Sequence, residues 1–237
     1  MAAAASDCGH HHGDEAVRKE NQACYEFLVP IVKGWSTELA IDVASTGVQV
    51  HGGMGFIEET GAAQYYRDAR ILAIYEGTTA IQANDLVGRK TARDGGAVAR
   101  SLIAQIRATE MALADVSGQY GSDLQAIRKR LNDGADALDA VVSYVVGNIK
   151  SDIKGVFSGS VLYLKLAGIV LGGWQMARAA LVAVDKLQAG AGDASFYQAK
   201  IATARFYADH ILTQASALQA SIIDGSVGVL ALTEDQF

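Results

Sequence analysis

Apolar residues recur three and four positions apart along most of the chain, the spacing that places them on one face of a helix. Leu124, Ile127, Leu131 and Leu138 form one such series. Alternating apolar and polar residues, which are typical of strands, are scarce. The pattern predicts helices over about 14–28, 30–50, 58–67, from 75 or 76 to 93, 97–113, 124–145, 161–187 and 194–223. The predicted fold is therefore all-α, an up-and-down helical bundle.

Proline and glycine set the expected boundaries between these helices. Pro30 is expected to begin the second helix, because the N–H groups of a first turn are unpaired in any case. The glycines of QVHGGMGF, residues 49–56, are expected to end that helix. The composition changes after Gly95 and Gly96, which predicts two parts, residues 1–94 and residues 95–237, with residues 1–13 disordered.

Charge and cysteine content narrow the classes of function. A net charge of -6 argues against a nucleic-acid partner, which needs a basic surface. Cys8 and Cys24 are the only cysteines and no secretory signal precedes them, so we expect a cytoplasmic location. His10–His12 have no further ligand at a useful spacing, so no metal site is expected. Polar residues interrupt the apolar run at 161–184 and predict a core helix rather than a membrane span: Lys165, Gln175 and Arg178.

A single carboxylate, Glu76, follows the apolar run that ends at Tyr75 and precedes a glycine, and the next basic residue after it is Arg89. Held among apolar neighbours, such a group would lose hydration, which raises its pKa and makes it a stronger base once ionised. A lone glutamate near a helix start is also commonly a cap partner or a favourable contact with the helix dipole. The pattern alone leaves both interpretations open.

Two other groups of residues also have a structural and a functional interpretation. The glycines of residues 52–55 could let the backbone approach a phosphate or a flavin closely, but a helix C-cap explains the same glycines. They lack the strand-to-helix context of a dinucleotide-binding fingerprint. The charged residues of RDAR, residues 67–70, are expected to form an ion pair that fixes the turn before Ile71.

The segment GVQVHGGMGFIEETGAAQYYRDARILAIYEGTTAIQ, residues 47–82, resembles the C-terminal signature of the flavin-dependent acyl-CoA dehydrogenases. It combines Gln-x-x-Gly-Gly-x-Gly-Phe, Arg-Asp-Ala and Ile-Tyr-Glu-Gly-Thr at closely similar spacing. Residues 95–237 contain GGWQMARAAL and QAKIATARFYADHIL and resemble the additional C-terminal helical domain of long bacterial members, including the 3-methylmercaptopropionyl-CoA dehydrogenase-like forms. The resemblance implies that residues 1–94 are the end of the family's C-terminal helical domain.

The resemblance also implies roles for individual residues. In most family members the glutamate of Tyr-Glu-Gly-Thr is the catalytic base, which implies that role for Glu76 in the α,β-dehydrogenation of an acyl-CoA thioester with FAD. Ala80 departs from relatives that carry a polar residue near the flavin. The other implied contacts are with the substrate for Tyr75 and Gly77, with FAD for Thr78, and with the FAD of a neighbouring subunit for Gln49, Gly52 and Gly53.

The implied partners are the acyl-CoA substrate and an electron-transfer flavoprotein, and a homodimer is favoured. The chain alone is expected to be inactive, because domains upstream in the family supply much of the flavin and CoA site. Two other functions stay open at this point. One is a non-catalytic helical module for docking or oligomerisation, and the other is an acyl-CoA oxidase.

Overall fold

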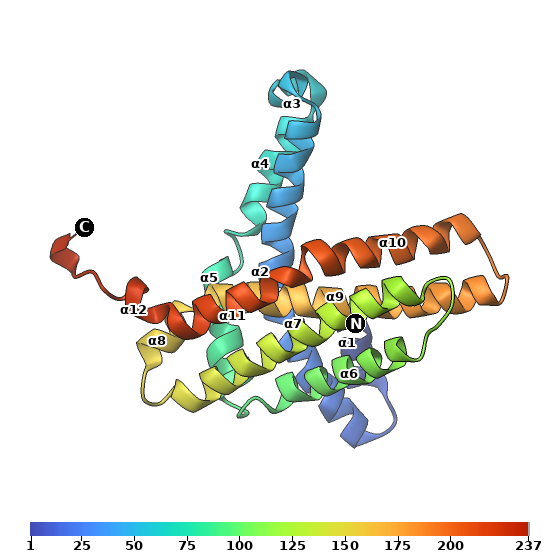
Figure 1. Cartoon of the computed structure of the whole chain (residues 1–237). Helices are drawn as coiled ribbons and strands as arrows, with labels where there is room; N and C mark the ends of the chain where they lie inside the picture. Colours follow the sequence, from blue (N-terminus) through green and yellow to red (C-terminus); the bar gives the residue numbers. More distant parts are fainter. Residues whose placement is uncertain (237) are drawn as a thin grey trace.

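Helices account for most of the chain in the computed structural model, which describes residues 1–236 (Figure 1). These residues include no strand, which confirms the predicted all-α fold. Four long helices lie side by side as an up-and-down bundle: α6 (Ala97–Ala114), α7 (Gly121–Asn148), α9 (Ser160–Gln188) and α10 (Ala194–His210). Shorter elements follow or connect them: α8 (Ile153–Ser158), η3 (Leu212–Gln214), α11 (Ala215–Asp224), α12 (Ser226–Val229) and η4 (Glu234–Gln236).

The helix at the centre of the molecule is α9. It packs against α7, α10 and α11, and also against α2 and α5 of the N-terminal part. Of the described helices it is the one long and apolar enough to cross a membrane, but 61% of its most apolar stretch is buried inside the molecule. This burial is the environment of a core helix, as the interrupted apolar run at residues 161–184 predicts.

Helix α2 (Glu15–Val50) is a single helix of 36 residues, about 54 Å long. The predicted boundary at Pro30 is therefore wrong, because Pro30 lies inside this helix. Phe27, Leu28 and Ile31 are buried on both sides of the proline, and the proline is buried as well. Tertiary packing thus continues through Pro30 and outweighs the lost backbone hydrogen bond.

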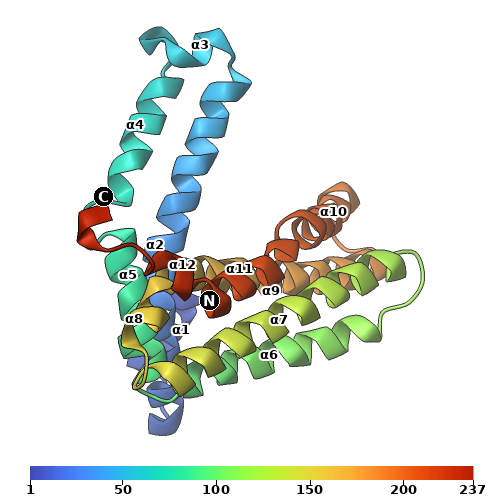
Figure 2. The ribbon, with the colours of Figure 1, turned by 60° about the vertical axis from the view of Figure 1, so that its left-hand side comes forward.

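The second half of α2 leaves the bundle and pairs with α4 (Ala62–Leu72), as Figure 2 shows. At the tip, α3 (Gly53–Phe56) and the 3-10 turn η1 (Glu58–Thr60) connect the two helices. We call residues 36–72 the arm. Large apolar side chains are exposed along it: Leu39, Val43, Val50, Met54, Phe56, Ile57, Tyr65, Tyr66 and Ile71. The arm therefore presents apolar surface that this chain does not cover.

Three other sequence predictions need correction. Residues 1–13 are not disordered, since α1 (Ala2–His11) is a helix packed against α2; alanine, the best helix former, makes up much of it. The helix predicted at 58–67 begins only after Gly61, whose φ of 78° cannot continue a helix. The helix predicted from residue 75 or 76 begins at Thr79, as α5 (Thr79–Asp85), and continues as the π-helical turn η2 (Leu86–Ala92).

Residues on both sides of the predicted division at 94/95 share one hydrophobic core. Phe27 and Leu86 from the first part and Leu164 and Leu138 from the second belong to the same buried cluster. Close backbone approach helps to join the parts: a Cβ atom added at Gly168 of α9 would lie 2.3 Å from the ring of Trp35 of α2. The division into two parts stays a prediction from sequence.

Candidate functional site

Four of the seven predicted site residues lie in the loop that joins α4 to α5, residues 73–78. Two consecutive residues of this loop, Glu76 and Gly77, have positive φ angles of 51° and 91°. A residue with a side chain rarely adopts this conformation, which costs about 1–2 kcal/mol relative to a right-handed one. Such a conformation persists only where the surrounding structure holds it, and it is found often at functional sites.

The Glu76 side chain is exposed in this chain. The expectation that the Glu76 carboxylate loses hydration is therefore wrong for this chain. Its neighbours Ile74 and Tyr75 are themselves exposed and do not enclose the carboxylate. Glu76 is also not a cap residue of α5. Thr78 has that position, and its hydroxyl oxygen accepts a hydrogen bond from the N–H of Ile81 at 3.4 Å.

The backbone of the loop leaves donors free. Within residues 1–236, the N–H groups of Glu76, Gly77 and Thr78 donate to no acceptor. The N–H of Thr79 instead donates to the carbonyl of Ala73 at 3.3 Å and closes the loop. The loop thus offers an exposed carboxylate and unpaired N–H groups within three residues, a combination that can take a proton and donate hydrogen bonds to an oxygen of a ligand.

Two residues of α2 that sequence reasoning missed hold this loop. The Lys33 ammonium donates to the carbonyls of Leu72, at 2.6 Å, and Tyr75, at 2.9 Å. The Glu38 carboxylate accepts a hydrogen bond from the hydroxyl of Thr79. Each of these residues is about forty positions away from its partner in the chain, so no local pattern could have indicated the contact.

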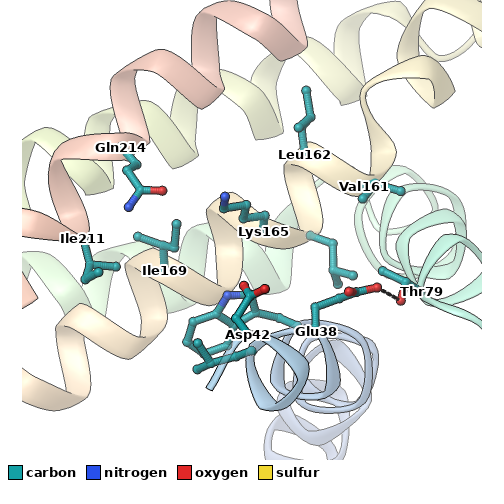
Figure 3. A pocket seen from close by; sticks show the side chains of 12 residues that line it. Glu38, Asp42, Thr79, Val161, Leu162, Lys165, Ile169, Ile211 and Gln214 are labelled. Atoms are coloured by element: carbon teal, nitrogen blue, oxygen red, sulfur yellow. Dashed lines mark hydrogen bonds between the residues drawn. The ribbon is translucent and has the colours of Figure 1, made fainter. Parts of the chain in front are cut away.

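A cavity of about 470 Å³ lies beside Thr79, between α2, α5, α9 and the turn η3 (Figure 3). Glu38, which binds Thr79, is part of its wall. The other polar residues of the wall are Asp42, Lys165 and Gln214, and the rest of the wall is largely apolar.

The remaining predicted site residues, Gln49, Gly52 and Gly53, lie at the tip of the arm. The C-cap interpretation of this turn is confirmed, since α2 ends at Val50 and Gly52, with φ 59°, donates its N–H to the carbonyl of Gln49 at 3.0 Å. A Cβ atom at Gly52 or Gly53 would meet no atom within 4 Å. This side of the turn is open to the close approach of a ligand.

The structure does not bring the two groups of predicted residues together. The tip turn and the Glu76 loop lie at opposite ends of α4, whose 11 residues span about 16 Å (Figure 2). One small ligand cannot touch both within one chain.

The predicted ion pair within residues 67–70 is wrong. Arg67 instead donates to Glu58 at 2.8 Å and to Gln64 at 2.9 Å, and Asp68 accepts from Gln64 at 2.7 Å. Adjacent residues of a helix point in different directions, so neighbours such as Arg67 and Asp68 cannot pair easily once they lie inside α4. Among the described residues, no three His, Cys, Asp or Glu side chains are grouped so that they could hold a metal ion.

Comparison with known families agrees with this architecture. Residues 3–90 match the model described as "Acyl-CoA dehydrogenase, C-terminal domain", and residues 102–233 match the one described as "Acetyl-CoA dehydrogenase C-terminal like". The chain belongs to the acyl-CoA dehydrogenase family, of which it represents a C-terminal part. The resemblance seen in the sequence is thereby confirmed.

Pairwise comparison shows which members of the family this chain resembles. It is 51% identical over 213 residues to the 3-methylmercaptopropionyl-CoA dehydrogenase of Ruegeria pomeroyi, a match that covers 90% of this chain and 35% of the relative. It is 36% identical over 192 residues to the broad-specificity linear acyl-CoA dehydrogenase FadE5 of Mycobacterium tuberculosis, with 79% and 31% covered. The rat mitochondrial short-chain specific acyl-CoA dehydrogenase is 38% identical over 73 residues, which cover 31% of this chain and 18% of the relative. The chain spans about a third of the length of the two bacterial relatives.

Proposed function

We propose that this chain is the C-terminal portion of an FAD-dependent acyl-CoA dehydrogenase and that Glu76 is the base that removes the α-proton of an acyl-CoA thioester. The observation that carries the proposal is the loop conformation. A signature shared with the family coincides with a strained, exposed glutamate beside unpaired N–H groups. Strain of this kind persists where function needs a side chain in one place.

The chain's own residues supply binding and proton transfer in this proposal. Glu76 takes the α-proton, and its N–H donates a hydrogen bond to the thioester oxygen, which makes that proton more acidic. Tyr75 and Gly77 lie on either side of the carboxylate and would border the substrate. The β-hydrogen would leave as a hydride, for which bound FAD would supply the acceptor.

The residues proposed to contact FAD are accessible to it from solvent. Gln49, Gly52 and Gly53 are exposed at the tip of the arm, and Thr78 is exposed beside Glu76. The separation of these places along α4 supports contacts with two different flavins, one near Glu76 and one of a neighbouring subunit at the tip. The complete enzyme would then be a homo-oligomer, for which we propose a dimer, located in the cytoplasm with an electron-transfer flavoprotein as its electron acceptor.

The test is Glu76→Gln in the longer enzyme, with Glu59→Gln as a matched control. Glu59 is an exposed glutamate of the arm and is outside the Glu76 loop. We expect Glu76→Gln to keep FAD bound and to lower kcat by about 10²- to 10⁴-fold or more, since a general base contributes that much. Glu59→Gln should leave kcat within about twofold.

Near-normal turnover of the Glu76→Gln enzyme would refute the assignment of the base. Two further observations separate the other candidate functions. A colourless longer protein without flavin would favour the helical docking module. Stoichiometric peroxide during turnover in air would favour an acyl-CoA oxidase.

A further inference from the structure

The Glu76 loop is held at its first end by one lysine of α2. The Lys33 ammonium donates to the carbonyl of Leu72, the last residue of α4, and to the carbonyl of Tyr75 inside the loop. It also lies 5.4 Å from the centre of the Tyr75 ring, within the range of a cation–π contact. A positive charge at the end of α4 is favourable as well, because the carbonyls there carry the negative end of the helix dipole.

The second end of the loop is held by the same helix. Glu38 lies five residues after Lys33 and accepts a hydrogen bond from the side chain of Thr79, the first residue of α5. Between these two contacts the loop packs against α5, since a Cβ atom at Gly77 would lie 2.8 Å from the side-chain nitrogen Nε2 of Gln82. The chain from Leu72 to Thr79 therefore has both ends fixed to α2.

We propose that Lys33 is the positioning residue that keeps Glu76 in its left-handed conformation and so fixes the direction of its carboxylate and of its free N–H. The catalytic consequence of this proposal rests on the proposed function, but the structural role of Lys33 does not. An ammonium carries three N–H donors on a flexible stem and can serve two carbonyls at once, whereas a guanidinium is a rigid planar fork. Without these donors, the carbonyls of Leu72 and Tyr75 lose their fixed partner, and Glu76 can relax to an ordinary backbone conformation.

The experiment uses the 237-residue chain itself with Lys33→Met, which keeps the apolar stem and removes the charge. Lys19→Met is the matched control, because Lys19 is on the same helix and makes only an exposed pair with Glu15. Nuclear magnetic resonance would measure the Cα and Cβ shifts of Glu76, which report its φ, and the amide exchange rate of Thr79. We expect Lys33→Met to move the Glu76 shifts away from left-handed values and to speed Thr79 exchange on the order of tenfold.

Amides of α7 and α9 provide the reference for overall stability. They should exchange at the same rate in the wild type, Lys33→Met and Lys19→Met. Lys33→Arg should restore the Glu76 shifts in part, because it keeps the charge and donors with a different shape. If Lys33→Met is too unstable to study, Lys33→Ala decides, since alanine favours the helix and removes every donor of residue 33, and left-handed Glu76 shifts in that variant would contradict the proposal.

Unchanged Glu76 shifts and Thr79 exchange in Lys33→Met would overturn the proposal, as would an equal acceleration of exchange throughout α7 and α9. The measurement needs neither FAD nor an acyl-CoA. A negative result for Lys33 would therefore not affect the Glu76→Gln test of the proposed function. A negative result of the Glu76→Gln test would likewise not affect the structural role of Lys33.

Discussion

Gly168 is the residue at which α9 passes closest to the indole of Trp35. A Cβ atom at this position would lie 2.3 Å from two atoms of this partly buried ring, so the ring or the helix has to shift. We expect Gly168→Ala to lower the free energy of unfolding by about 1–3 kcal/mol. Gly147→Ala in α7 is the control: its Cβ would meet nothing within 4 Å, and alanine in a helix should stabilise by up to about 1 kcal/mol. Urea denaturation measures both; equal stabilities would contradict the contact.

Tyr163 and Thr91 form a buried pair that joins α9 to η2. Their hydroxyl oxygens are 2.9 Å apart and both residues have no exposed surface. Tyr163→Phe leaves the Thr91 hydroxyl unpaired, which we expect to reduce the free energy of unfolding by about 1–3 kcal/mol. The double variant Tyr163→Phe with Thr91→Val should recover part of that loss in urea denaturation. Additive losses would mean that the two hydroxyls do not interact.

The same tyrosine gives stability a dependence on alkaline pH. Burial raises the pKa of Tyr163 above its usual range, whereas an unfolded tyrosine ionises near about pH 10. The stabilisation is therefore fully present below about pH 10 and is lost as pH rises from there toward the folded pKa. The Phe variant lacks this contribution, so its stability should fall less steeply between about pH 9.5 and 11.

At this scale the sequence identified residues better than it described their surroundings. Glu76 stood out because it follows an apolar run and precedes a glycine. Its exposure and its positive φ could not be predicted, since they depend on Lys33 and Glu38, which are distant in the chain. Long-range contacts of this kind leave no periodic signal in a single sequence.

Helices with a continuous apolar face were predicted well. Helix boundaries near a proline or near a residue with positive φ were not. The spacing of Leu124, Leu131 and Val145 predicts α7, and the same residues are buried in it. Local rules predict a boundary at Pro30 because they describe isolated helices, while burial on both sides carries α2 through the proline. Because Gly61 and Glu76 have positive φ angles, α4 and α5 begin later than predicted. The apolar pattern gives no indication of these angles.

The arm should be the least protected part of the folded chain. Helix α4 packs chiefly against α2, while α9 is surrounded by several helices. We therefore expect backbone amides of α4 to exchange on the order of a hundredfold faster than those of α9, since local opening there exposes little buried surface. Hydrogen exchange with mass spectrometry of peptides from both helices measures this. Comparable protection of α4 at low protein concentration would show that the arm is stable without a partner.

The whole chain should fold but should not act as an enzyme by itself. The shared core of the bundle supports folding, and each buried Leu or Ile contributes roughly 1.5–3 kcal/mol. A flavin held only through the tip turn and Thr78 would lack most of the contacts that position it for catalysis. Titration of FAD and then an acyl-CoA into the chain should show neither stoichiometric binding nor bleaching of the flavin absorbance. Tight binding followed by bleaching would show that further domains are dispensable.

The uninterrupted course of α2 from the bundle to the tip constrains how the length of this protein can vary among relatives. Each residue added to a helix lengthens it by about 1.5 Å and rotates the remainder of the helix by about 100°. Inserting one residue between Glu38 and Gln49 would rotate the glycine turn to another side of the arm. The contacts of α4 with α2 would then be lost along the whole of α4. Insertions and deletions should therefore collect in the connections at 115–120 and 189–193, at the far end of the bundle from the arm (Figure 1). An alignment of relatives with gaps inside α2 would contradict this.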